Sequence, residues 1–191
     1  MSDKTERNYW HPGFIGAMEL ELRSFRKNLD FKDEHSLSKE PIKMDMLIIK
    51  KSRDVVIDNQ IGNIFREHNI FEYKSPDAGI TIDDYYKTMA YAYLYKALGN
   101  TVDEISGAEL TVTMVRDVHP DGLFKKIADY GGAVERKFPG IYYIRGVFNT
   151  PSQFIVGCEL DTDLHAFLKA LTKKAKVADV KTLLCEVQGL T

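Results

Sequence analysis

Residues 70–76 constrain the fold of this 191-residue chain more than any other stretch. Read as a strand, the stretch alternates its side chains between two faces, so Glu72 and Lys74 share one face and Phe71 and Tyr73 share the other. A carboxylate and an ammonium side by side are unusual for pure packing, because buried charges are costly unless they are paired or bind a metal. The stretch therefore predicts a strand whose charged face has a chemical role.

The residues that follow predict where this strand ends and a helix begins. Pro76 ends the strand, because proline lacks the backbone N–H that a sheet requires. Thr81 and Asp84 then have the spacing of a capping box, in which each side chain accepts a hydrogen bond from the backbone of the other residue. A charged strand end beside a helix start is a common location for chemistry in α/β proteins.

Composition predicts one globular domain of ordinary size. The net charge of −2 provides no global basic signature for nucleic acid, although a local basic cleft can exist on a neutral protein. The chain has no apolar run of about 18 residues, and residues 1–7 lack the apolar core of a signal peptide, so no membrane partner is expected. The two cysteines, Cys158 and Cys185, belong to no Cys/His cluster and give no indication of a zinc site or a disulfide framework. We therefore expect a cytoplasmic, reduced location.

Hydrophobic periodicity predicts a long helix, two strands and a short helix before residue 70. The helix begins near His11, and the strands cover 30–37 and 42–50, with a short helix over 60–67 after them. The apolar stripe of the first helix repeats every three or four residues: Phe14, Met18, Leu22, Phe25 and Leu29.

The second half of the chain has the same alternation. A helix over 82–98 precedes a strand over 110–115, and a β-hairpin forms around Pro139 and Gly140 between strands 134–137 and 141–147. The helix over 82–98 has a predicted apolar stripe at Tyr86, Met89, Ala90, Tyr93, Leu94 and Ala97. The remaining predicted elements are helices over 121–130, 162–174 and 177–187 and a strand over 154–160. The prediction is a single α/β domain over 1–191, with a possible subdivision near residue 117.

Three acidic residues on these elements could converge: Glu21 at the edge of the helical stripe, Asp45 on the second strand and Glu72 on the third. If the two strands pair, Asp45 and Glu72 project from one face of the sheet. Two carboxylates that close repel each other unless a cation lies between them, and Mg²⁺ or Mn²⁺ prefers such oxygen ligands. Lys74 on the same face can orient a metal-bound water and offset charge on a phosphate. Together these residues are the minimal set for metal-assisted phosphodiester hydrolysis.

In this order of elements and motifs the chain resembles the PD-(D/E)XK nuclease superfamily. The resemblance covers residues 11–116, and residues 117–191 form a C-terminal extension with a β-hairpin and helices. It is similar to a bacterial branch in which Phe-Glu-Tyr-Lys-Ser-Pro precedes a helix rich in tyrosine and lysine. The resemblance implies a restriction-endonuclease-like core (α-β-β-β-α-β), a Mg²⁺ or Mn²⁺ cofactor, DNA as the substrate and a possible homodimer.

The same resemblance implies a role for individual residues. Asp45 matches the metal-binding aspartate, Glu72 and Lys74 match the Glu-x-Lys pair, and the Tyr73 carbonyl is a further metal ligand. Glu21 matches the acidic residue of the first helix in many members. An additional polar residue is expected from the following helix, where three residues are candidates: Tyr86, Lys87 and Tyr91.

Two features depart from the family pattern. Met44 precedes Asp45, where proline is typical. The gap of 27 residues between Asp45 and Glu72 is longer than a simple hairpin requires, and the predicted helix over 60–67 accounts for it.

Other interpretations of the same residues remain open. Asp45 could be a turn-capping carboxylate, and Glu72 and Lys74 a surface ion pair worth about 0–1 kcal/mol. The chain could then be a non-catalytic module that keeps the nuclease fold and binds nucleic acid or a protein, or an unrelated α/β enzyme acting on a small phosphorylated substrate. The five dispersed histidines favour surface or core roles over metal binding. A basic run has two interpretations, a solvated helix end or a phosphate contact: Lys169, Lys173, Lys174 and Lys176.

Overall fold

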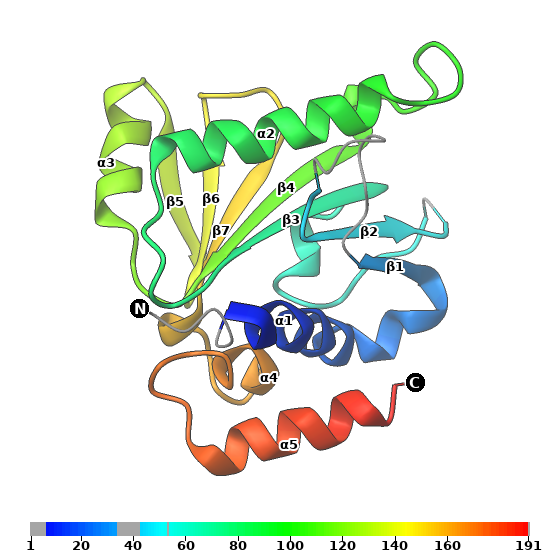
Figure 1. The fold of residues 1–191 in the computed structure, drawn as a ribbon. Helices are drawn as coiled ribbons and strands as arrows, with labels where there is room; N and C mark the ends of the chain where they lie inside the picture. The colour runs from blue at the N-terminus through cyan, green and yellow to red at the C-terminus, as the bar shows by residue number, and fades with distance from the viewer. Residues whose placement is uncertain (1–6, 34–42, 53, 191) are drawn as a thin grey trace.

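The computed structural model describes residues 7–33, 43–52 and 54–190 (Figure 1). Its centre is one seven-stranded sheet in the order β1-β2-β3-β4-β7-β6-β5. The strands are β1 (Leu29–Asp33), β2 (Met46–Lys50), β3 (His68–Lys74), β4 (Leu110–Arg116), β5 (Ala133–Phe138), β6 (Ile141–Arg145) and β7 (Ser152–Val156).

The sheet is mixed and mostly antiparallel. Strands β1, β2 and β3 pair antiparallel, the central strands β3, β4 and β7 pair parallel, and β7, β6 and β5 pair antiparallel again. The predicted α/β class is confirmed. Strands from both sides of residue 117 belong to this one sheet, because β7 pairs directly with β4.

Helices cover both faces of the sheet (Figure 1). Helices α2 (Ile82–Ala97) and α3 (Asp121–Asp129) lie on one face, and α1 (Arg7–Glu21), α4 (Ala166–Lys169) and α5 (Val177–Gln188) lie on the other. Strand β3 alternates between these two layers, with Phe71 and Tyr73 in the core under α1 and Ile70 in the core under α2. The charged face of β3 is therefore the face that α2 covers. Among the described residues, no helix is long and apolar enough to cross a membrane.

The first helix is shorter than predicted. Phe14, Met18 and Leu22 are buried as the stripe predicts, but α1 ends at Glu21 and a 3₁₀ helix, η1 (Arg23–Asn28), follows. The tighter helix delivers Leu29 into β1, opposite Lys50 of β2. The predicted strand over 30–37 is described only to Asp33, and the rest lies outside the described residues.

Helix α2 begins where the sequence predicts. The Asp84 N–H donates to Thr81 Oγ1 (3.3 Å) and the Thr81 N–H donates to Asp84 Oδ2 (2.8 Å), which completes the capping box. The buried face, however, is rotated from the predicted stripe, so that Tyr86, Tyr93 and Leu94 are exposed. Its buried residues are Tyr85, Thr88, Met89 and Ala92. The hydroxyl of Tyr85 reaches Ser152 Oγ of β7 (2.8 Å), a partner that periodicity cannot predict.

Smaller differences occur elsewhere. The predicted helix over 60–67 is only a 3₁₀ turn, η2 (Gly62–Ile64), and the predicted helix over 162–174 is only the short α4. The strand predicted over 154–160 both begins and ends earlier, as β7 at Ser152–Val156. The predicted hairpin is present, and Gly140 at its turn has φ +72° and no room for a Cβ atom, which would lie 2.6 Å from the Leu160 nitrogen. Both cysteines are exposed.

Candidate active site at the end of strand β3

The register of β2 against β3 brings Asp45 and Glu72 to the same place. Met46 pairs with Phe71, so Asp45, immediately before β2, comes opposite Glu72. Asp45 Oδ2 accepts a hydrogen bond from the Tyr73 N–H (2.7 Å), which joins the two strands beyond their last paired residues. The gap of 27 residues does not disturb this pairing, because the intervening chain loops away through η2 and returns to β3.

Lys74 occupies the same face of β3 as Glu72. Its Nζ lies 3.2 Å from Glu72 Oε1 and 3.1 Å from Asp84 Oδ1 at the start of α2. The Lys74 side chain is 18 % exposed and that of Glu72 is 8 % exposed, so this is a largely buried network and not a surface ion pair. The capping residue Asp84 thus has a second role that its sequence motif does not indicate.

Burial and mutual repulsion shape the ionisation of the two acids. Burial raises the pKa of Asp45, although the Tyr73 N–H and the charges of His11 and Lys74 act in the opposite direction. Burial also raises the pKa of Glu72, and the neighbouring negative charge of Asp45 raises it further. Both carboxyls are therefore less easily ionised in the folded protein than in water, as expected for two acids that share one largely buried site.

Lys74 and Asp84 show the opposite pattern. Burial disfavours the Lys74 ammonium, but Glu72 and Asp84 more than compensate and raise its pKa. Burial likewise opposes ionisation of Asp84, yet the Thr81 N–H and the Lys74 ammonium lower its pKa overall. Lys74 is therefore a stable cation held between two carboxylates.

Two further residues face this site. His11 Nδ1 lies 3.4 Å from Asp45 Oδ1, and Lys87 on α2 attracts both Asp45 and Glu72 electrostatically. Of the three polar candidates on this helix, Lys87 is the one whose charge acts on both acids, and its Nζ lies 5.4 Å from the centre of the Tyr91 ring. Neither His11 nor Asp84 was predicted as a site residue, because nothing local in the sequence distinguishes them from a helix-start residue and a cap.

The structure places Glu21 elsewhere. It lies at the C-terminal end of α1, ten residues and about 15 Å along the helix from His11. Its carboxylate bonds His165 Nδ1 (2.5 Å) and accepts from Asn59 Nδ2 (3.4 Å), and the side chains of Glu21 and His165 are 2 % and 1 % exposed. Glu21 is thus part of a buried pair that connects α1 to the segment before α4, and it is not brought to Asp45.

The ring of Tyr73 points to the α1 face, as the alternation of β3 predicts. It stacks on Phe14 at 5.0 Å between ring centres, and its hydroxyl is buried with no hydrogen-bond partner among the described residues. The Tyr73 N–H is used by Asp45, and a ligand role for the Tyr73 carbonyl stays a prediction.

The donor set suits a hard divalent cation. Asp45 and Glu72 supply carboxylate oxygens, which Mg²⁺ and Mn²⁺ prefer, and their mutual repulsion would be relieved by an ion between them. Magnesium sites commonly use one or two protein carboxylates and complete their coordination with water and substrate phosphate. Two acids without Glu21 are therefore sufficient for this type of site.

The basic run near the C-terminus is partly occupied by the protein itself. Lys169 Nζ donates to the Leu160 carbonyl (2.7 Å), and Lys173 Nζ pairs with Asp77 in the loop that follows β3. This exposed pair joins the segment after α4 to the loop between β3 and α2.

Comparison with known proteins gives no match: no family model, curated protein or solved structure corresponds to this chain.

Proposed function

We propose that this protein is a metal-dependent nuclease that hydrolyses phosphodiester bonds in DNA, with Asp45, Glu72 and Lys74 as its catalytic residues. The observation that carries the proposal is the convergence of two largely buried acids with raised pKa values beside a lysine held at 3.2 Å from one of them. Such an arrangement is unfavourable for folding alone, because burying charges is costly, and it suits a site that awaits a dication.

The order and pairing of the elements support the same assignment. Helix α1, the antiparallel strands β1, β2 and β3, the crossover helix α2 and the parallel strand β4 follow one another in the α-β-β-β-α-β order of the restriction-endonuclease-like core. In that arrangement the acid before the second strand and the Glu-x-Lys strand meet, as Asp45 and Glu72 do here.

Each residue has a distinct task in this proposal. A bound Mg²⁺ would polarise the scissile phosphate and lower the pKa of an attacking water. Asp45 and Glu72 would hold the ion, and the Tyr73 N–H fixes the orientation of Asp45. Lys74 would orient the water and offset the negative charge that develops on the phosphate. Asp84 holds the Lys74 ammonium in place from the opposite side.

A second function, a non-catalytic module that keeps this fold, is favoured by one specific observation. Lys74 is already held by two carboxylates, and Lys169 and Lys173 are bonded within the protein, which leaves fewer cations for a nucleic-acid backbone. This alternative predicts binding of a partner without cleavage.

A cleavage assay separates the two functions. Supercoiled, linear and single-stranded DNA are incubated with the protein in Mg²⁺, Mn²⁺ or EDTA. We expect cleavage only with metal, and a loss of about 100-fold in Asp45→Asn and Lys74→Met, the usual cost of removing one group that stabilises the transition state. The matched controls are Glu135→Gln and Lys96→Met, whose ion pairs with Arg145 and Asp103 lie away from the site.

The outcomes are distinct. Cleavage that persists in Asp45→Asn and Lys74→Met would refute the assigned mechanism. Absence of cleavage with either metal, together with no detectable DNA binding, would refute the nuclease and favour a binding module whose partner is a protein. Activity on small phosphoesters and none on DNA would instead support an unrelated α/β enzyme.

A further inference from the structure

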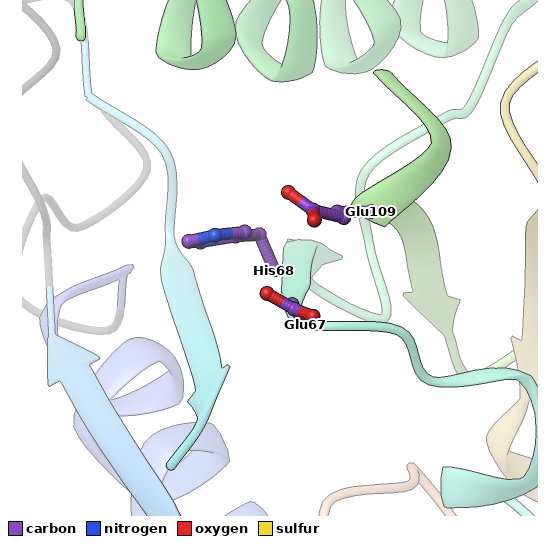
Figure 2. Close-up of side chains that lie close together, drawn as sticks. All are labelled: Glu67, His68 and Glu109. Carbon is purple, nitrogen blue, oxygen red and sulfur yellow. The ribbon is translucent and has the colours of Figure 1, made fainter. Parts of the chain in front are cut away.

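A second group of potential metal ligands lies at the opposite end of the same strands. Within the described ranges, Glu67, His68 and Glu109 are the one set of three His, Cys, Asp or Glu residues whose ligand atoms all lie within 4.8 Å of one another (Figure 2). All three side chains are half-buried. His68 is four residues before Glu72 on β3, about 13 Å along the strand, so this group is separate from the candidate active site.

The fold brings the three residues together through the starts of two parallel strands. His68 is the first residue of β3 and pairs with Leu110, the first residue of β4. Glu67 therefore lies directly before β3, and Glu109, the last residue of the 3₁₀ helix η3 (Gly107–Glu109), lies directly before β4. In Figure 2 the Glu109 carboxylate lies above the His68 side chain and the Glu67 carboxylate lies below it.

Each ligand is anchored by neighbouring groups. The Ser106 N–H donates to Glu109 Oε2 (3.0 Å), and the Lys50 N–H holds the backbone of Glu67 through its main-chain carbonyl (2.9 Å). The Tyr95 hydroxyl lies 2.9 Å from His68 Nδ1 and fixes the orientation of the ring. Metal-binding histidines usually have such a hydrogen-bond partner, which sets their orientation and tautomer.

The surroundings favour a cation. Two carboxylates this close repel each other unless positive charge lies between them. Tyr95 lies near the C-terminal end of the 16-residue helix α2, and this end of a helix carries partial negative charge. The Arg66 guanidinium, which donates to the Ala108 carbonyl, opposes a second cation here, whereas the two acids and the helix end attract one.

We propose that Glu67, His68 and Glu109 form a second metal site, selective for Zn²⁺ over Mg²⁺. Zinc takes imidazole nitrogen and carboxylate oxygen together, and an open zinc site has three protein ligands and a water. Magnesium prefers oxygen alone, whereas an imidazole ligand suits zinc. The ion would connect the starts of β3 and β4. This inference is independent of nuclease activity.

The test measures zinc bound to the full-length chain after EDTA treatment, by equilibrium dialysis in excess Mg²⁺. Asp45→Asn serves as the background, so that the candidate active site does not contribute. We expect one Zn²⁺ per chain, a rise in melting temperature on zinc addition, and an affinity at least about tenfold lower when Glu109→Gln is added. His119→Gln is the matched control, because His119 also pairs with a carboxylate, that of Glu159 at 2.7 Å.

The folding of the Glu109→Gln variant is checked by its melting temperature without metal, and His68→Gln provides a second, independent removal of a ligand. Zinc binding that survives both substitutions, or that is lost in His119→Gln instead, would overturn the proposal. A wild-type chain that binds no zinc in excess Mg²⁺ would overturn it as well. Loss of zinc binding in both ligand variants, with folding intact, would establish the site.

Discussion

Replacement of Asp45 by asparagine should make the metal-free protein more stable. The pKa of Asp45 is raised by burial, so its ionised form is less favourable in the folded chain than in the unfolded chain. The folded chain therefore keeps the Asp45 proton up to a higher pH than the unfolded chain does. As a result, the free energy of unfolding decreases as pH rises from the ordinary pKa of aspartate through the raised pKa of the folded state. Asparagine has no charge to bury, so the variant escapes this loss.

The contacts of Asp45 give the size of the effect. Removal of a buried charge beside Glu72 should contribute roughly 1–3 kcal/mol. Against this, the Tyr73 N–H bond of 2.7 Å becomes a bond to a neutral acceptor, which costs about 1 kcal/mol. The pair with His11 contributes near zero, because the His11 side chain is 41 % exposed. The net gain is about 1 kcal/mol, or about 2–4 °C in melting temperature for a chain of this size.

Thermal and urea unfolding in EDTA at pH near 8 measures this gain. The same measurement at pH near 4 should show a smaller gain, because the wild-type carboxyl is protonated to a greater extent at the lower pH. Added Mg²⁺ should stabilise the wild type and not Asp45→Asn, which reduces or reverses the difference. An Asp45→Asn variant that is less stable than wild type in EDTA at pH near 8 would refute the reasoning that the two acids are held together against their own repulsion.

Three other substitutions test separate parts of the structure by urea unfolding. Tyr73→Phe should leave stability unchanged or raise it by up to about 1 kcal/mol, because the hydroxyl that it removes is buried with no hydrogen-bond partner in the described part of the chain. A loss of more than about 1 kcal/mol would show that the hydroxyl does make a hydrogen bond. Thr81→Ala should cost about 1 kcal/mol through loss of the capping box, and an unchanged stability would contradict a capping role. Glu21→Ala should cost about 1–3 kcal/mol, because it leaves the buried His165 Nδ1 without its hydrogen-bond partner, and a neutral effect would show that this pair is not a structural connection.

Local sequence patterns predicted most of the elements but not their exact faces. The capping box located the start of α2, and alternation assigned Phe71 and Tyr73 to one face of β3, because both features depend on neighbouring residues. The buried side of α2 was predicted one residue away from the observed one. That choice depends on Tyr85 reaching Ser152, 67 residues further on, and local periodicity contains no information on such a contact.

The candidate site likewise contains residues that local patterns predict and residues whose positions depend on distant parts of the chain. Asp45, Glu72 and Lys74 could be nominated because pairing between strands two and three follows from the order of elements. Glu21 could not be placed, because its surroundings depend on His165, which is 144 residues away in the sequence. His68 was considered only as one of five dispersed histidines, since its acidic neighbour Glu109 becomes adjacent only when β3 and β4 pair in parallel.

Helix α2 contacts β3 near both of its ends, so residues that stabilise the helix also hold side chains of the two candidate sites. Near its start Asp84 caps the helix and holds Lys74, whereas near its end Tyr95 holds His68. Loss of Thr81 should weaken the helix while Asp84 can still pair with Lys74, so stability and the proposed catalysis remain separable there. Loss of the Asp84 side chain removes one half of the capping box, the hydrogen bond from the Thr81 N–H, and leaves the Lys74 ammonium to Glu72 alone. Asp84 is therefore the position at which a stability defect and a change in the Lys74 environment should always occur together.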